Sequence, residues 1–124
     1  MPAPPGIRPE DWDATKAAAL AVLIARAKRR TAQTISYSEL AGRIGPLEFD
    51  AHDKIFHNML GELSVEQYET NLGMISVLVV HQPPSDLRPG PGFYKLARDL
   101  RPDAPADDEQ LWVEEFNRVL DAHR

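Results

Sequence analysis

The segment from Ile35 to Gly45 constrains the fold more than any other part of this chain. Ser36 and Glu39 have the spacing of a capping box, in which a serine begins a helix and a glutamate three residues later supports it. The pair Gly45-Pro46 is typical of a helix end. A short helix is therefore predicted over residues 37–44. A short capped helix followed by a second amphipathic segment is how helix-turn-helix units begin, so nucleic-acid binding is the first function to consider.

The spacing of apolar residues predicts the remaining elements. Helices are expected over 9–30, over 51–63 with an extension toward 71, over 93–100, and from Asp107 or Asp108 onward. A short strand is expected at 34–36. The segment Met74–Val80 is β-branched and almost wholly apolar, which predicts a strand buried on both faces. Four prolines and two glycines make 82–92 a stiff loop.

This order of elements predicts an α+β fold, a winged helix-turn-helix with additional N-terminal and C-terminal helices. In such a fold the helix over 51–63 is available for a DNA groove, and the loop over 82–92 forms the wing. Residues 1–8 are rich in proline and are expected to be a flexible arm before a single domain over 9–124.

The composition limits the classes of protein. The chain has no cysteine, which excludes disulfides, thiol chemistry and thiolate metal sites. No apolar run has transmembrane length, and Met1–Gly6 lacks the features of a signal peptide. A cytoplasmic protein with no membrane partner is therefore expected.

The charges are distributed unevenly. The net charge of −5 argues against a general nucleic-acid binder. However, residues 1–45 carry seven basic and four acidic side chains, whereas residues 46–124 carry seven basic and fifteen acidic ones. A basic face beside an acidic C-terminal element fits this pattern, and an ordinary solvated surface fits it equally well.

Three motifs resemble the C-terminal winged-helix domain of the DNA alkyltransferases and alkyltransferase-like proteins. Tyr37-Ser38-Glu39-Leu40-Ala41 matches the first helix of that domain, Ser76-Val77-Leu78-Val79-Val80 stands where its reactive Pro-Cys-His-Arg-Val-Val strand lies, and Pro89-Gly90-Pro91-Gly92-Phe93 stands at its Gly-rich segment. The resemblance runs from about Ile35 to Leu100. The stretch from Met74 to Phe93 also resembles small uncharacterised bacterial proteins, which implies no function.

The resemblance implies DNA binding without alkyl transfer. Tyr37 matches a tyrosine that contacts the phosphate of the flipped nucleotide, and Lys54 falls near an arginine that fills the gap in the base stack. Ser76 replaces the reactive cysteine, while Val77 and Leu78 replace the histidine and arginine. Alkyl transfer is thereby excluded, because neither a thiolate nor an adjacent base is present.

The leading hypothesis is thus a non-enzymatic winged-helix protein that binds double-stranded DNA, either as a regulator or as a binder of DNA lesions or structures. Its candidate contacts are the tyrosine and the basic residues expected around the helices and the wing: Tyr37, Arg29, Arg30, Arg43, Lys54, Arg88, Lys95 and Arg98. Lys95, Arg98 and Arg101 are expected to form one basic strip. The competing hypothesis is a protein-interaction or dimerisation module, which the acidic balance favours.

Other candidate sites are less well supported by the sequence. Asp50, His52, Asp53 and His57 cluster near the start of the second helix, but capping explains the aspartates, so no metal site is predicted. Prolines beside Gly90 and Gly92 remove N–H donors that a phosphate-binding turn requires. His81 is expected to make a hydrogen bond at a strand end, and an enzyme using it or the Asp/His cluster is the third hypothesis. No cofactor is expected, and Trp12 and Trp112 are assigned to the core.

Overall fold

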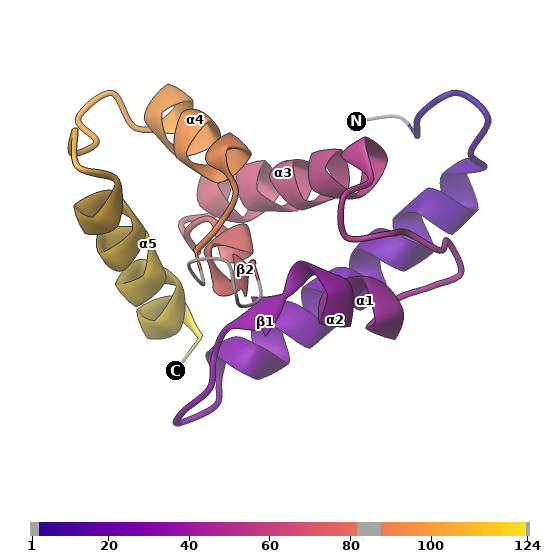
Figure 1. Cartoon of the computed structure of the whole chain (residues 1–124), viewed down its shortest axis with the longest axis horizontal. Helices are drawn as coiled ribbons and strands as arrows, with labels where there is room; N and C mark the ends of the chain where they lie inside the picture. Colours follow the sequence, from indigo (N-terminus) through magenta and orange to yellow (C-terminus); the bar gives the residue numbers. More distant parts are fainter. Residues whose placement is uncertain (1–2, 82–87, 124) are drawn as a thin grey trace.

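The computed structural model describes residues 3–81 and 88–123. The chain forms helices joined by short extended segments (Figure 1). In chain order these are α1 (Pro9–Ala27), β1 (Ile35–Ser36), α2 (Tyr37–Arg43), α3 (Lys54–Glu69), the 3-10 helix η1 (Ile75–Leu78), β2 (Val79–Val80), α4 (Pro91–Leu100) and α5 (Asp108–Ala122).

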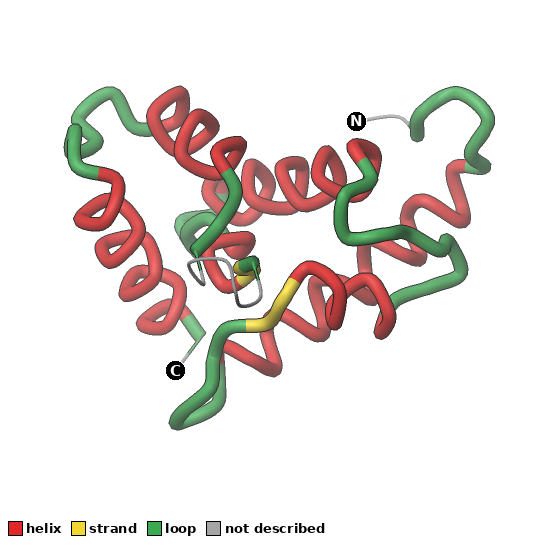
Figure 2. Tube along the Cα trace, viewed as in Figure 1, coloured by secondary structure: helices red, strands yellow, loops and turns green. Residues whose placement is uncertain are grey.

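The predicted winged helix-turn-helix fold is wrong. A wing is a β-hairpin, whose two strands are antiparallel and adjacent in sequence. Within the described residues the sheet consists of β1 and β2, which pair in parallel with Ile35 opposite Val79 and Ser36 opposite Val80. Parallel strands cannot be joined by a tight turn, so this pair is not a hairpin. Figure 2 shows how little of the chain is strand.

Part of the predicted wing lies outside the described residues, namely 82–87. The rest of that loop leads directly into a helix, because Pro91 and Gly92 form the first turn of α4 rather than the end of the loop. The expected additional helices at the two ends of the domain are present as α1 and α5.

The strand predicted over Met74–Val80 is mostly a 3-10 helix. Its predicted burial is confirmed, since every residue of the segment is buried. Its predicted conformation is wrong over Ile75–Leu78, and only Val79 and Val80 are extended. A continuous apolar run carries no periodicity that separates strand from buried helix, and η1 contacts α1, α3 and α5 on its different sides. Helices surround this segment where a buried strand of a small sheet was expected.

The predicted start of α2 is confirmed. The Ser36 hydroxyl oxygen accepts a hydrogen bond from the backbone N–H of Glu39 at 3.0 Å. The Glu39 carboxylate also pairs with Arg26 Nη2 at 2.5 Å and Arg43 Nη2 at 2.8 Å. The residue expected to support a local cap therefore also ties α2 to the end of α1.

Two helices have boundaries that differ from the prediction. α1 ends at Ala27, with Lys28 at its C-cap, so Arg29 and Arg30 lie beyond the helix. α3 begins at Lys54 and continues to Glu69, and its N-cap position is Asp53 rather than Asp50. The Asp53 Oδ2 atom accepts from the Asp50 N–H at 2.8 Å, which closes the turn before the helix.

The apolar faces of the helices agree well with the expected periodicity. Phe56, Met59, Leu60 and Leu63 of α3 are buried, whereas Ile55, expected on the same face, is 38% exposed. Trp12 is buried as predicted, but Trp112 is only partly buried, with its indole N–H donating to the Val77 carbonyl at 3.1 Å.

The helices surround the η1–β2 segment. In Figure 1, α3 and α4 lie side by side, α1 crosses below them beside α2, and α5 borders the opposite side from the start of α1. None of the described helices is both long enough and apolar enough to cross a bilayer.

Candidate functional site

A cleft of about 770 Å³ lies between α3, the start of α4 and the start of α1. Its apolar walls come from side chains on these three helices, with Trp12, Leu60, Phe93 and Leu96 as the largest. Its polar side chains come from more distant parts of the sequence and include Tyr37, His52, Lys54, His57, Asn58, Ser76 and His81. The fold therefore gathers a basic and aromatic set of side chains at one concave surface.

Tyr37 is the centre of an aromatic cluster at this cleft. The His57 ring stacks on the Tyr37 ring with centroids 4.7 Å apart and an interplanar angle of 21°. The His81 ring lies 4.8 Å from the same ring at 41°. Because Tyr37 begins α2, His57 lies on α3 and His81 follows β2, one phenol ring links three separate segments.

The hydroxyl of Tyr37 also organises the start of α4. The backbone N–H of Gly90 donates to the Tyr37 Oη atom at 3.0 Å, in a buried environment. Burial raises the pKa of the Tyr37 phenol, and the hydrogen bond from Gly90 opposes only part of that rise. The hydroxyl therefore stays neutral and can donate its own proton.

Gly90 lies close to two polar side chains of the cleft. A Cβ atom at this position would lie 3.3 Å from His81 Nε2 and 3.5 Å from Tyr37 Oη. The polar ends of these two side chains therefore converge on the glycine. A Cβ here would make an ordinary contact with Tyr37 and a tight one with His81, which would have to shift by a few tenths of an ångström.

His57 has a defined orientation. Its Nε2 atom lies 2.7 Å from the carbonyl oxygen of Ala51. Because a carbonyl oxygen only accepts, Nε2 carries the hydrogen in this contact, and the neutral ring keeps Nδ1 as an acceptor.

The acidic residue that lines the cleft, Glu62, forms an ion pair with Lys16. Glu62 Oε1 accepts from Lys16 Nζ at 2.7 Å, and the same ammonium reaches Glu66 Oε2 at 2.8 Å. Burial by itself would raise the pKa of Glu62, but the hydrogen bond and charge of Lys16 outweigh it and lower the pKa. The carboxylate is thus ionised at neutral pH and paired with an ammonium that it shares with Glu66.

Two donors in the cleft are buried. Trp12 is 2% exposed, and its indole N–H has no hydrogen-bond partner among the described residues. Ser64 donates from its hydroxyl to the Ser76 Oγ atom at 2.5 Å, and the Ser76 N–H donates back to Ser64 at 3.0 Å. In that arrangement the Ser76 hydroxyl hydrogen remains available to donate. The residue at the position of the alkyltransferase cysteine thus contacts another hydroxyl rather than a base.

The candidate DNA contacts have different surroundings. Tyr37 and Lys54 both line the cleft. Arg43, Arg88 and Arg98 each face a carboxylate, at 2.8 Å from Glu39, 2.9 Å from Glu109 and 2.6 Å from Asp108. Arg29 and Arg30 follow the end of α1, and Lys95 is exposed on α4.

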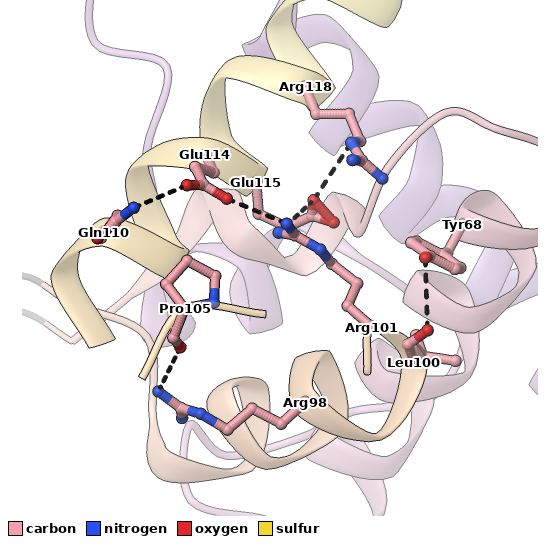
Figure 3. A network of polar contacts seen from close by, with 9 residues as sticks. All are labelled: Tyr68, Arg98, Leu100, Arg101, Pro105, Gln110, Glu114, Glu115 and Arg118. Carbon is pink, nitrogen blue, oxygen red and sulfur yellow. Dashed lines mark hydrogen bonds and ion pairs between the residues drawn. The ribbon is translucent and has the colours of Figure 1, made fainter. Parts of the chain in front are cut away.

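The predicted basic strip on α4 is also not formed. Arg98 donates to the carbonyl oxygens of Pro105 and Ala106, and Arg101 is 8% exposed and donates to Glu114 Oε1 at 3.0 Å. Figure 3 shows both guanidinium groups turned toward α5 and the segment before it. Arg101 is therefore withheld from solvent, and Arg98, whose side chain is 36% exposed, is paired with Asp108.

The remaining candidates also have structural roles. Among residues 3–81 and 88–123 no group of three metal-ligating side chains is found, and the Asp53 and His57 side chains are held by backbone groups of the same turn. The large apolar residues that are exposed in the described part of the chain, Ile55 and Val113, lie on different helices. They do not form a patch for a protein partner.

Sequence reasoning overlooked His57 and Gly90 as members of the Tyr37 cluster. A histidine one turn into an amphipathic helix is usually a surface residue, and a glycine between prolines usually belongs to a turn. Only their contacts with Tyr37, which the sequence does not reveal, show that these two residues belong to the cluster.

Comparisons with family models, with curated proteins and with solved structures found no match.

Proposed function

We propose that the protein is a non-enzymatic binding protein whose cleft holds a planar organic anion of nucleotide type. The observation that carries the proposal is the composition of the cleft, in which flat apolar walls lie beside basic and hydrogen-bond-donating groups. A nucleotide has both a flat ring and an anionic phosphate. The volume of about 770 Å³ also falls within the usual range for small-molecule sites, roughly 300–1,000 Å³.

The charges of the cleft favour an anion. Lys54, His52 and the two imidazoles beside Tyr37 line it, and the carboxylate of Glu62 is paired with Lys16, which also pairs with Glu66. The Ser76 hydroxyl, which can donate, lines the same cleft. A ligand rich in acceptor oxygens would accept from Lys54 and from this hydroxyl.

A binding role is favoured over a catalytic one by the environment of Ser76. Its hydroxyl contacts the hydroxyl of Ser64 and has no imidazole or carboxylate partner among the residues that the structure describes. A serine nucleophile needs an adjacent base, and this arrangement offers none.

The same nucleotide chemistry has two sources, a free nucleotide and one nucleotide presented by a DNA strand. If the nucleotide belongs to a DNA strand, the protein binds DNA, so this proposal includes the DNA-binding hypothesis. Because Arg43, Arg88 and Arg98 are engaged by carboxylates, a contact confined to the cleft is favoured over a long phosphate-binding surface.

Equilibrium binding distinguishes the two sources. The probes are adenosine monophosphate, a single-stranded oligonucleotide and a duplex of the same sequence, followed by Trp12 fluorescence and by NMR shifts at the cleft. Binding of the mononucleotide supports a free ligand. Binding of only the oligonucleotides, with affinity that falls as salt rises, supports a DNA source. Absence of binding by all three at low salt would overturn the proposal.

Two lysines provide a matched pair of variants. Lys54 lines the cleft, whereas Lys95 is an exposed lysine on α4 that is not among the lining residues. Lys54→Ala should weaken binding about tenfold, which corresponds to a charge-assisted hydrogen bond of roughly 1.5 kcal/mol. Lys95→Ala should leave the affinity nearly unchanged. Equal losses in both variants would indicate nonspecific charge attraction instead.

A further inference from the structure

Glu115 is a carboxylic acid enclosed on the inner face of α5. Its exposed fraction is 0%, like those of Leu111 and Val119 on the same face. Figure 3 shows it among the residues that join α5 to the end of α4. This position is unusual, because glutamate is almost never fully buried without a close partner.

No close partner satisfies the Glu115 carboxyl group. Neither of its oxygens has a hydrogen-bond partner among the described residues. The nearest cationic atoms are Arg118 Nε at 3.7 Å and Arg101 Nη1 at 4.0 Å from Oε2. Both distances exceed the usual hydrogen-bond range of about 2.7–3.2 Å.

Arg101 is directed mainly toward the neighbouring glutamate. Its Nη2 atom donates to Glu114 Oε1 at 3.0 Å, while its Nη1 atom has no hydrogen-bond partner in the described part of the chain. Glu114 is more exposed and is also bonded by Gln110 Nε2 at 3.1 Å. The exposed Glu114 carboxylate thus accepts a hydrogen bond from the Arg101 guanidinium, and the enclosed Glu115 carboxylate does not.

The other groups around Glu115 do not replace the missing hydrogen bonds. α5 contributes Glu114 and Arg118, the segment after α4 contributes Arg101, and η1 contributes no ionisable side chain. On the α3 side, Arg118 lies over the uncharged Tyr68 ring at 5.9 Å from its centroid. Burial raises the pKa of Glu115, and the attraction of Arg118 and Arg101 opposes that rise only in part.

The face that carries Glu115 holds α5 in position. Trp112 of α5 donates its indole N–H to the Val77 carbonyl of η1 at 3.1 Å, and a Cβ on Gly73 would lie 3.0 Å from a Val119 methyl carbon. A charge that forms on this face must therefore either stay desolvated or move α5 away from η1.

We propose that Glu115 is a proton-dependent anchor, whose neutral carboxyl group keeps α5 docked on η1 and whose ionisation loosens that helix. The inference goes beyond the proposed binding function and does not depend on it. The docked state binds one more proton than the undocked state at pH values between the ordinary glutamate pKa of 4.5 and the raised one. Docking therefore weakens as pH rises through this window, by up to about tenfold per pH unit, and levels off above it.

The test uses the full chain. The carboxyl carbon of Glu115 is titrated by NMR, with Glu115→Gln for assignment, and hydrogen-exchange protection of α5 is compared with that of α3 from about pH 5 to about pH 8. The expected results are a Glu115 midpoint above the ordinary value and α5 protection that falls with pH relative to α3. In Glu115→Gln the fall should disappear.

Glu109→Gln is the matched control, because it alters an exposed carboxylate of α5 that pairs with Arg88 rather than with Arg101 or Arg118, and it should leave the pH dependence of α5 in place. A Glu115 titration midpoint in the wild-type protein at or below the ordinary glutamate pKa would overturn the proposal. This measurement is made on the wild-type protein, so it remains valid even if a variant folds poorly. Protection of α5 that does not change relative to α3 across the titration would overturn it as well.

Discussion

Removal of the Tyr37 hydroxyl tests how strongly this side chain organises the cleft. Tyr37→Phe preserves the ring that packs between His57 and His81 but removes the atom that accepts from the Gly90 N–H at 3.0 Å. Tyr37 is 7% exposed and Gly90 is buried, so water cannot easily replace the lost acceptor. A buried donor left without a partner costs about 1–3 kcal/mol, and this is the expected loss in the free energy of unfolding.

Equilibrium urea unfolding measures the loss, and thermal unfolding provides a second estimate of roughly 4 °C per kcal/mol for a domain of this size. Tyr68→Phe is the control. Its hydroxyl donates to the Leu100 carbonyl at 3.4 Å and is only partly buried, so its removal should cost less than about 0.5 kcal/mol.

The reasoning would be refuted if Tyr37→Phe lost no more stability than Tyr68→Phe. The Gly90 N–H would then have another acceptor in the variant, such as solvent, and the Tyr37 hydroxyl would not organise the start of α4. Loss of ligand binding without loss of stability would instead point to a direct contact between the hydroxyl and the ligand.

Three further perturbations address the cleft and the caps. Gly90→Ala should weaken nucleotide affinity a few-fold, because its Cβ would make a tight contact with His81 Nε2 at 3.3 Å, whereas Gly92→Ala, with nothing within 4 Å of its Cβ, should leave the affinity unchanged; isothermal calorimetry compares the two variants. Lys16→Met should cost about 1.5–3 kcal/mol at pH 7, measured by urea unfolding. Because Lys16 lowers the pKa of Glu62, this stabilisation is present above the ordinary pKa of 4.5 and is lost as pH falls through the depressed one, so the variant should lose less stability on acidification. Ser36→Ala should cost about 1 kcal/mol by loss of the α2 cap, and an unchanged unfolding midpoint would contradict that role.

Local signals in the sequence predicted the helix starts correctly where a side chain caps the backbone. Ser36 accepts from Glu39 N–H, and Asp107 accepts from the Gln110 N–H at 3.1 Å. These contacts span three residues and need no distant partner, so they can be deduced from spacing. The apolar stripe of α3 is predictable for the same reason, since its period is a property of the helix itself.

The cleft could be predicted only in part. Tyr37 and Lys54 were among the candidate residues and do line it. The pair between Arg43 and Glu39 has i, i+4 spacing on one helix and could have been deduced from the sequence. The interactions of Arg88 with Glu109 and of Arg98 with Asp108 could not, because each pair joins segments on either side of a loop. When the carboxylate that pairs with a basic residue cannot be predicted, the residue is wrongly expected to be available for a phosphate contact.

The sequence by itself determined where the helices with a side-chain cap begin, which faces the helices bury and that the segment Met74–Val80 lies in the core. Only the tertiary structure decided that this segment is mainly a 3-10 helix, because an apolar run satisfies burial equally well in either conformation and the surrounding helices select one. Tertiary structure also decided which charges are neutralised and that Tyr37, His57 and Gly90 meet at one cleft. Caps and periodicity depend on neighbours within one turn, whereas a site depends on contacts between segments that the chain brings together only by folding.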